Sequence, residues 1–390
     1  MKITLATEVF PPRAGGAGWS ARALALALKD AGHDVHVVTT AAGPPAEGGV
    51  PITRLPGVSG PFRRGRMVEI FRKSLTAVAN EADVIHAQHS LSAMGALALD
   101  PRPRVVVTVR DHWPVCFWST RMSQGSLCPQ CSTANMWRCV DGRLPSLATP
   151  LAIPYMKWDL SSKQSALSRA DAIIAVSAAI AAELRELALS AVHVLPNIVD
   201  GAEAERIAGE PATISLPDRF VLFVGKLEAN KGARDLIPAM VHAKTALPLV
   251  VLGSGSEERV IREQSERHGI EVHLRGWADR GDVLRAMKRA EALVFPSTWP
   301  EPLSRVLLEA LALGTPIAAM DTGGTPELIE DGISGLLAHD VAQLGDALGR
   351  IVHDAPARSR LKEGASSRAR AFSPQALIPR YEALYRGPAR

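Results

Sequence analysis

The sequence predicts an α/β fold with two Rossmann-like, doubly wound domains. Short apolar strands alternate with helical segments in both halves of the chain. Each half opens with a strand, a glycine-bearing turn and then a helix, which is typical of doubly wound sheets. The chain has 390 residues, 47% of them hydrophobic, which is enough for two or three domain cores.

The first half contains six apolar runs that predict strands. The first run, residues 2–9, leads through the glycine turn into a helix expected at Ser20 to Asp30. The other five strands are expected at 34–40, 83–88, 104–111, 171–177 and 192–196. Strands that alternate with helices in this way indicate a parallel sheet with helices on its faces.

The second half contains five further strand-like runs, at 219–225, 248–253, 271–276, 291–297 and 316–321. The two series are separated by a charged segment with glycine and proline, 201–218, where we place the domain boundary. We therefore expect a first domain over 1–200 and a second over 216–372. A final helix over 373–390 is expected to pack back on the first domain.

Charge and hydropathy exclude several classes of protein. The net charge is only +4, from 44 basic and 40 acidic residues, and no basic groove with interleaved aromatic residues indicates nucleic-acid binding. The opening residues, MKITLATEVFPPR, form too short an apolar run for a secretion signal or a membrane span. The expected location is the cytoplasm.

One segment, residues 61–76, concentrates positive charge. It holds a single acidic residue, Glu69, against five basic ones, which are Arg63, Arg64, Arg66, Arg72 and Lys73. Apolar residues are interleaved with these charges, as in an amphipathic helix. The pattern indicates either peripheral contact with anionic lipid at the inner face of the cell membrane or an ordinary solvated helix face.

Two glutamates, Glu301 and Glu309, lie on either side of a predicted helix start. Prolines flank Glu301, and apolar residues at helical spacing begin soon after it, so the helix should start near Leu303 or Ser304. The unpaired amides of a helix start bind anions such as phosphate. This layout favours a diphosphate at the amides, with polyols beside the two carboxylates.

Glycine turns and lysines lie where strands end. Gly15 and Gly16 follow the first strand, and their backbone could approach a phosphate or sugar closely, although a tight turn without a ligand explains them as well. Lys226 and Lys231 follow the first strand of the second half and could neutralise a leaving diphosphate. The alternative is that both lysines are simply solvated.

Nine ordered motifs resemble retaining nucleotide-sugar glycosyltransferases of family 4. The resemblance implies the GT-B fold, in which two Rossmann-like, doubly wound domains face each other across a cleft. The resemblance covers nearly the whole chain. Its most specific part is FPSTWPEPLSRVLLEALALGTPIA, at 295–318. The other matches are PPRAGGAG, GHDVHVVT, ADAIIAVS, VLPNIVD, FVGKLEANKG, VLGSGSE, LRGW and TGGTPELIEDGISGLL.

The resemblance implies a hexosyltransferase with an acceptor-side first domain and a nucleotide-sugar-binding second domain. In the second domain, Lys226 and Lys231 would hold the donor diphosphate and the amides of Leu303 and Ser304 its distal phosphate. The other implied contacts are Glu301 with the transferred sugar, Glu309 with the ribose, Ala278 with the base, and Gly16, from the first domain, with the reaction centre. No dedicated base or divalent metal is expected, because the leaving phosphate is thought to take the acceptor proton.

The sequence departs from this family after the strand at 104–111. The family often has histidine beside the sugar there, whereas this chain has Arg110, Asp111 and His112. Either Arg110 takes that place as a permanent cation, or His112 substitutes for the usual histidine. The structural alternative is that Arg110 pairs with a carboxylate.

All four cysteines lie within 24 residues, in a segment we interpret as an insertion over about 112–160. A cytosolic enzyme is expected to hold them as metal ligands rather than disulfides. Irregular spacing and neighbouring tryptophans favour a 4Fe–4S cluster, with zinc as the alternative and four inert thiols as the remaining possibility. The expected ligands are Cys116, Cys128, Cys131 and Cys139.

Three functions of different classes remain. The first is transfer of a sugar from a UDP- or GDP-sugar, with retention, to a glycan, lipid-linked or small-molecule acceptor, in cell-surface polysaccharide or glycoconjugate synthesis. The second is a nucleotide-sugar epimerase of GT-B-like fold, which would need acid and base residues but no acceptor. The third is a metal-cluster sensor with a vestigial sugar site.

Overall fold

The computed structural model describes residues 1–390 except 13, 61, 125, 142, 144–148, 212 and 388–390. The chain divides into two compact units, each with its own parallel sheet. Unit 1 comprises Met1–Ile198 with Pro374–Arg390, and unit 2 comprises Val199–Ser373. Every strand that the sequence predicted is present, so the expectation of two Rossmann-like domains is confirmed.

The sheet of unit 1 has the strand order β10-β9-β6-β5-β1-β2-β4-β3, and only the short β3–β4 pair is antiparallel. Its strands are β1 (Lys2–Thr7), β2 (Asp34–Thr39), β3 (Ala46–Glu47), β4 (Val50–Arg54), β5 (Val84–Ala87), β6 (Arg104–Val109), β9 (Ala172–Ala175) and β10 (Val192–Val194). The helices around it are α1 (Gly16–Asp30), α2 (Arg63–Ala79), α3 (Ser90–Leu97), α6 (Ala178–Glu186) and α15 (Pro374–Arg386).

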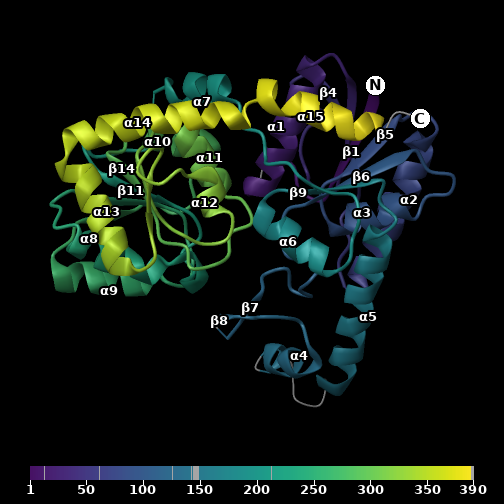
Figure 1. Cartoon of the computed structure of the whole chain (residues 1–390), viewed down its shortest axis with the longest axis horizontal. Helices are drawn as coiled ribbons and strands as arrows, with labels where there is room; N and C mark the ends of the chain where they lie inside the picture. Colours follow the sequence, from purple (N-terminus) through teal and green to yellow (C-terminus); the bar gives the residue numbers. More distant parts are fainter. Residues whose placement is uncertain are drawn as a thin grey trace. The chain divides into compact units, whose positions relative to one another are not determined.

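Helix α15 belongs to the core of unit 1 although it ends the chain (Figure 1). Leu377, Tyr381 and Tyr385 are buried in the same cluster as strands β1 and β2. The hydroxyl of Tyr385 lies 2.8 Å from Nδ1 of His86, on β5. The carboxy-terminal segment therefore completes the first sheet domain.

Helix α2 contains most of the basic segment, whose first residue, Pro61, lies outside the described residues. Its apolar residues Met67, Phe71 and Leu75 recur every four positions and are buried. The helix packs against α3, so this apolar face lies inside unit 1. Arg64 pairs with Asp159 at 3.1 Å, and Arg72 pairs with Glu69 at 2.7 Å. Burial of the apolar face leaves only the charged side of α2 available to a membrane surface.

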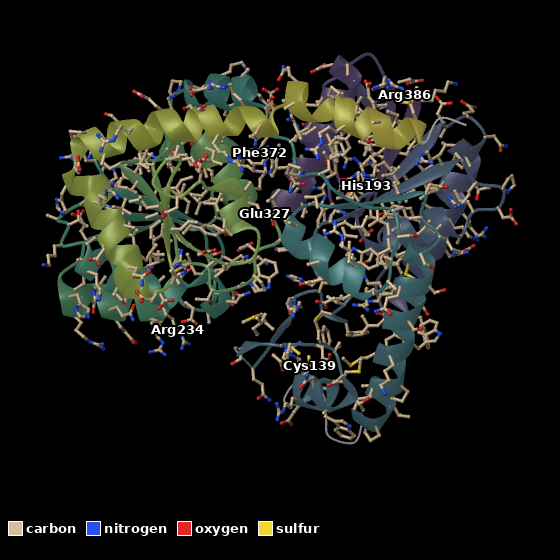
Figure 2. All side chains as sticks on the ribbon, in the orientation of Figure 1. Cys139, His193, Arg234, Glu327, Phe372 and Arg386 are labelled. Atoms are coloured by element: carbon tan, nitrogen blue, oxygen red, sulfur yellow. The ribbon has the colours of Figure 1, made fainter. Side chains whose placement is uncertain are left out.

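The segment between β6 and β9 extends away from the sheet of unit 1 and includes Cys139 (Figures 1 and 2). It contains β7 (Met122–Ser123), β8 (Ser126–Leu127), α4 (Thr133–Val140) and α5 (Thr149–Leu167). A small core of its own holds it together, formed by Phe117, Met136, Val140, Ile153, Met156 and Leu160. We refer to residues 112–167 as the outlying segment.

The sheet of unit 2 has the order β13-β12-β11-β14-β15-β16, and all its pairs are parallel. Its strands are β11 (Val221–Val224), β12 (Leu249–Leu252), β13 (Val272–Leu274), β14 (Ala292–Phe295), β15 (Ile317–Met320) and β16 (Leu336–Ala338). The α-helices are α7 (Gly201–Ala208), α8 (Leu236–His242), α9 (Glu258–His268), α10 (Arg280–Arg289), α11 (Arg305–Ala312), α12 (Thr325–Leu328), α13 (Val341–His353) and α14 (Ala355–Ala369). Short 3-10 turns at Ala229–Lys231, Ala233–Asp235 and Arg370–Phe372 connect them.

The supposed linker at 201–218 begins with a helix rather than a coil. The side chain of Asp200 caps α7 by accepting a hydrogen bond from the amide of Glu203 at 3.0 Å. Helix α7 then packs on α10 and α11 of unit 2. No helix in the described ranges has the length and apolar character needed to cross a bilayer.

Candidate functional site

Each sheet has one position where the strand order reverses. In unit 2, β12 and β13 follow β11 on one side of the sheet, and β15 and β16 follow β14 on the other side, so the order reverses between β11 and β14. In unit 1 the reversal lies between β1 and β5. Ligands of open parallel sheets bind beyond the carboxyl ends of the strands at such positions, so the loops after these four strands define the candidate sites.

The two loops at the unit 2 reversal are held tightly together. Gly232 has a φ of +68°, and a Cβ there would lie 1.9 Å from the carbonyl oxygen of Pro296. The amide of Trp299 donates to the carbonyl of Asn230 at 3.0 Å. Only glycine allows this approach at position 232, so the loop after β11 is fixed against the loop after β14.

Lys231 and Glu301 meet between these two loops. Nζ of Lys231 lies 2.5 Å from Oε1 of Glu301, and the hydroxyl of Ser297 donates to the same oxygen at 3.0 Å. The ammonium also lies 4.1 Å from the centroid of the Trp299 ring, within the range of a cation–π contact. Lys226, at the start of the first loop, is exposed. The structure thus joins one of the two predicted lysines to the predicted glutamate.

Helix α11 begins where the sequence predicted, directly after Ser304. The Ser304 side chain caps the helix by accepting from the amide of Leu307 at 3.4 Å. Leu303 and Ser304 are both largely buried. The positive end of α11 therefore lies three residues from Glu301, as a phosphate site at this position requires.

Glu309 lies in a different environment from the one that the sequence suggested. Its Oε1 atom accepts from Nε of Arg280 at 2.9 Å and from Nε of Arg305 at 3.1 Å, and all three side chains are buried. Arg280 also pairs with Glu203, on α7, at 3.2 Å. Glu309 thus links α10 and α11 directly and α7 through Arg280.

The turn that was assigned to the nucleobase lies after β13. The amide of Gly253, at the end of β12, donates to the carbonyl of Gly276 at 2.7 Å, which connects the ends of β12 and β13. Trp277, the next residue, is 69% exposed, and Ala278 beside it is half-buried. An exposed indole beside this turn offers a flat apolar surface for a base.

The unit 1 reversal contains a buried carboxyl group that sequence reasoning missed. Oε1 of Glu8, just after β1, accepts from the amide of Ser92 at the start of α3, at 2.7 Å. Burial raises the pKa of Glu8 to about 7, against the lowering effect of the Ser92 hydrogen bonds. Burial also lowers the pKa of His89 to about 3, with the charge of Arg110 adding to the shift. Position at a strand end, before the exposed Gly15 and Gly16, was the signal that could have revealed Glu8.

The structure separates Arg110 from His112. Arg110 is buried after β6, and its guanidinium donates to the side-chain oxygens of Gln88 and Asn197. His112 turns to the other side, where its Nδ1 lies 2.9 Å from Oε2 of Glu183, on α6. Arg121 holds the other oxygen of Glu183 at 2.5 Å. Arg110 therefore lies at the reversal, whereas His112, the first residue of the outlying segment, contacts Glu183 on α6. Glu183 carried no sequence signal.

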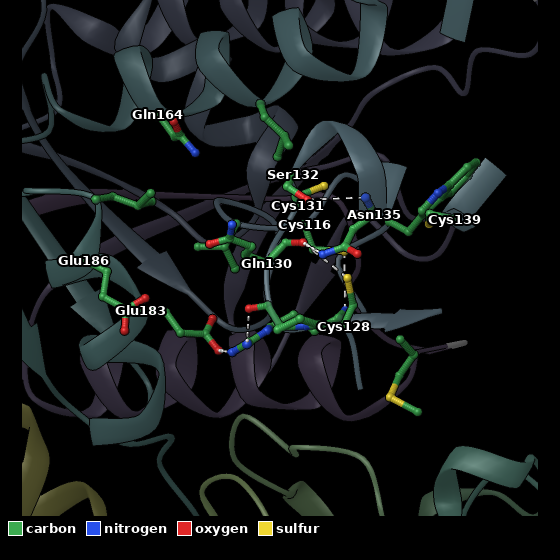
Figure 3. Close-up of a pocket in the computed structure, with 17 residues that line it drawn as sticks. Cys116, Cys128, Gln130, Cys131, Ser132, Asn135, Cys139, Gln164, Glu183 and Glu186 are labelled. Atoms are coloured by element: carbon green, nitrogen blue, oxygen red, sulfur yellow. Dashed lines mark hydrogen bonds and ion pairs between the residues drawn. The ribbon is translucent and has the colours of Figure 1, made fainter. Parts of the chain in front are cut away.

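The four cysteines are free and line one cavity in the outlying segment, with a volume of about 430 Å³ (Figure 3). In the described part of the chain, however, no three His, Cys, Asp or Glu side chains are arranged to hold a metal ion. The predicted iron–sulfur or zinc centre thus has no support from these side-chain positions.

Comparison with known proteins bears on both units. The family model described as "Glycosyltransferase Family 4" matches residues 14–203, and the model described as "Glycosyl transferases group 1" matches residues 210–368. A glycogen synthase of Mycobacterium tuberculosis is 32% identical over 208 residues, which are 51% of this chain and 49% of the relative. A D-inositol 3-phosphate glycosyltransferase of Corynebacterium jeikeium is 34% identical over 180 residues, 43% of each chain. The matches span about half the length of these curated relatives.

Solved structures resemble the whole chain. Anabaena Alr3699/HepE in complex with UDP has a TM-score of 0.70 at 19% identity, covering 98% of both chains. Sucrose-phosphate synthase from Thermosynechococcus elongatus has a TM-score of 0.71 at 22% identity, covering 99% of this chain and 98% of that one. These likenesses, with the two parallel sheets, show the GT-B fold. Residues 14–203 thus match a glycosyltransferase family 4 model and residues 210–368 match a glycosyltransferases group 1 model, each over less than half of the chain.

Proposed function

We propose that this protein transfers a sugar from a nucleoside-diphosphate donor to a hydroxyl group of an acceptor, with retention of the anomeric configuration. The Lys231–Glu301 pair beside the start of α11 carries the proposal. An ammonium and the positive end of a helix at one strand-order reversal suit a diphosphate, and a carboxylate beside them suits the hydroxyls of the sugar. The similarity to structures solved with UDP and UDP-glucose makes a UDP-sugar the first donor to test.

The main contribution of unit 2 to catalysis is neutralisation of the charge on the leaving diphosphate. As the bond to the sugar breaks, negative charge develops on the leaving diphosphate, and Lys231 with the α11 amides stabilises that charge. Lys226, exposed at the start of the same loop, adds a second cation. The leaving phosphate accepts the acceptor proton on the same face, which gives retention without a separate base.

The acceptor is assigned to the reversal of unit 1. Arg110 is a permanent cation fixed by Gln88 and Asn197, so it suits an acceptor or sugar that carries negative charge. A glycan, lipid-linked or small-molecule acceptor fits that requirement where it carries a phosphate or carboxylate group. Synthesis of cell-surface polysaccharide or glycoconjugate is the pathway class we infer.

A donor screen tests the proposal. Full-length protein is incubated with UDP- and GDP-sugars, with and without candidate acceptors, and release of the nucleoside diphosphate is measured. We expect release with at least one donor, a rise in melting temperature with the matching nucleotide, and an NMR spectrum in which the product keeps the donor's anomeric configuration. No release and no nucleotide-induced stabilisation with any donor would refute sugar transfer, and an inverted product would refute retention.

An epimerase is the competing function. It would change the configuration of the nucleotide sugar without any acceptor, so the sugar recovered from an acceptor-free reaction distinguishes the two. Transfer predicts unchanged donor in that reaction, apart from slow hydrolysis. A new nucleotide-sugar isomer would instead establish the epimerase.

A further inference from the structure

The outlying segment brings together four thiols from four separate places in the chain. Cys116 follows the sheet, Cys128 follows the small hairpin, Cys131 precedes α4 and Cys139 lies within α4. All four line the same cavity (Figure 3), although the outer two are 23 positions apart in the sequence. The chain has no other cysteine. Folding thus brings thiols from both ends of this 24-residue stretch to one space.

All four thiols line this one cavity, and thiolate sulfur is the ligand that zinc and iron–sulfur clusters prefer. A metal cation among them would offset the mutual repulsion of four thiolates.

The surroundings offer further contacts to a thiolate centre. The amide of Arg121 donates to Sγ of Cys116 at 3.4 Å, as hydrogen bonds to metal-bound sulfur do. The strands β7 and β8 of the segment are only two residues each, and its core contains six buried side chains. Small units of this kind are commonly completed by a structural metal.

We propose that Cys116, Cys128, Cys131 and Cys139 bind one thiophilic metal centre, a zinc ion or an iron–sulfur cluster, inside this cavity. Within the residues described, no three possible ligands yet surround one point, so binding draws the thiols inward by rotation of their side chains. The cavity of about 430 Å³ leaves room for either centre. This role is separate from sugar transfer, which needs no thiol and no electron.

The centre would also order the contact between the segment and helix α6. Arg121 makes this contact, because its guanidinium donates to the carbonyl of Pro129 at 2.9 Å and to Glu183, on α6, at 2.5 Å. Glu183 in turn holds His112 at 2.9 Å. Loss of the metal is therefore expected to loosen His112 as well as the cysteine loops.

The test is metal analysis of the full-length protein, purified without oxygen or chelator from cells supplied with zinc and iron. We expect about one zinc ion per chain, or about four irons with matching sulfide, and these two outcomes distinguish the zinc ion from the cluster. Cys128→Ser and Cys131→Ser, which change the two less buried thiols, should each lower the metal content at least tenfold. Met122→Leu, at the same cavity, should retain it.

A second measurement does not depend on variants that fold. Thiol reactivity of the wild-type protein is counted before and after chelation, and limited proteolysis follows cleavage within residues 112–148. We expect protected thiols and an intact segment before chelation, and reactive thiols with cleavage afterwards. Absence of zinc and iron from the purified protein, together with no binding on reconstitution with zinc or with iron and sulfide, would overturn the proposal. Equal metal content in both serine variants and the wild type would overturn it too.

Discussion

Lys231 and Glu301 form an ion pair across the strand-order reversal of unit 2, with 2.5 Å between Nζ and Oε1. The two residues are 70 positions apart, and each lies on a loop that follows a parallel strand. Because the ring of Trp299 lies 4.1 Å from the same ammonium, Lys231 is fixed before any ligand arrives. A preorganised cation of this kind is what stabilisation of a leaving diphosphate requires.

Replacing the cation should impair catalysis far more than folding. For Lys231→Met we expect kcat/KM to fall by about 10²- to 10³-fold, because the charge on the leaving group loses its nearest ammonium. The free energy of unfolding should change by less than about 1.5 kcal/mol, since the pair is only partly buried. Steady-state kinetics and urea titration measure the two effects. Lys362→Met, an exposed lysine of α14, is the matched control; an equal loss of activity in both variants would contradict a local role.

The buried charges around Glu309 predict a structural effect. Burial lowers the pKa of Arg305, and the Glu309 carboxylate opposes that shift, so removing the carboxylate leaves buried guanidinium groups poorly compensated. We expect Glu309→Gln to lower the unfolding free energy by about 3 kcal/mol. Glu363→Gln, on the exposed side of α14, should change it little. If Glu309→Gln keeps full stability while UDP binding weakens, Glu309 acts through the ligand and not through the helices.

Glu8 predicts a specific dependence of stability on pH. Its pKa is raised from 4.5 to about 7 in the folded state, so the folded protein retains this proton after the unfolded chain has lost it. The contribution of Glu8 to the free energy of unfolding is therefore fully present below about pH 4.5. It is lost progressively up to about pH 7, by roughly 3 kcal/mol in total. Glu8→Gln cannot ionise and should flatten that part of the profile. Parallel profiles for variant and wild type, from urea titrations at pH 5 to 8, would argue against the shift.

Substitution by alanine should lower stability at one glycine and leave it unchanged at another. A Cβ on Gly253 would lie 1.8 Å from the carbonyl oxygen of Gly225, at a φ of +154°, so Gly253→Ala should destabilise unit 2 by more than about 2 kcal/mol. A Cβ on Gly15 would meet nothing within 4 Å, so Gly15→Ala should leave the melting temperature unchanged.

The Gly15 variant also tests the ligand itself. If backbone near Gly15 approaches a phosphate or sugar, Gly15→Ala should raise the KM of the donor or acceptor despite its unchanged stability. Unaltered kinetics would show that this glycine serves only the turn. Gly18→Ala is the comparison variant for an effect on folding. Its added Cβ would lie 2.5 Å from Cβ of Ala14, so this variant should lower the melting temperature.

The helix start at Ser304 was predictable because the information is local. Prolines around Glu301 and the apolar spacing from Val306 onward occupy one short stretch of chain. The strands were predictable for the same reason, since each is a short run of buried apolar residues. The helix at Gly201–Ala208 was missed because its charged residues resemble a linker, although Asp200 and Glu203 form a recognisable cap.

The sites were only partly predictable. Glu301 and Lys231 were both identified, but nothing local indicates that they touch each other while Lys226 remains exposed. Glu309 occupies the expected helix, yet its pairing with Arg280 depends on how α10 packs against α11. Glu183 was missed because one carboxylate in a chain with 40 acidic residues carries no signal until its burial is known. Glu8 was missed although it follows a strand, because its contact with Ser92 depends on how α3 packs.

The sequence by itself determined the alternation of strands and helices, the glycine turns and the order of the motifs, because these depend on residues close together along the chain. Tertiary structure decided which side chains meet. It buried the apolar face of α2 inside unit 1, directed Arg110 and His112 to different partners, and gathered four cysteines around one cavity. Those outcomes depend on contacts between distant segments, whose geometry is set by the packing of whole elements and not by any local pattern.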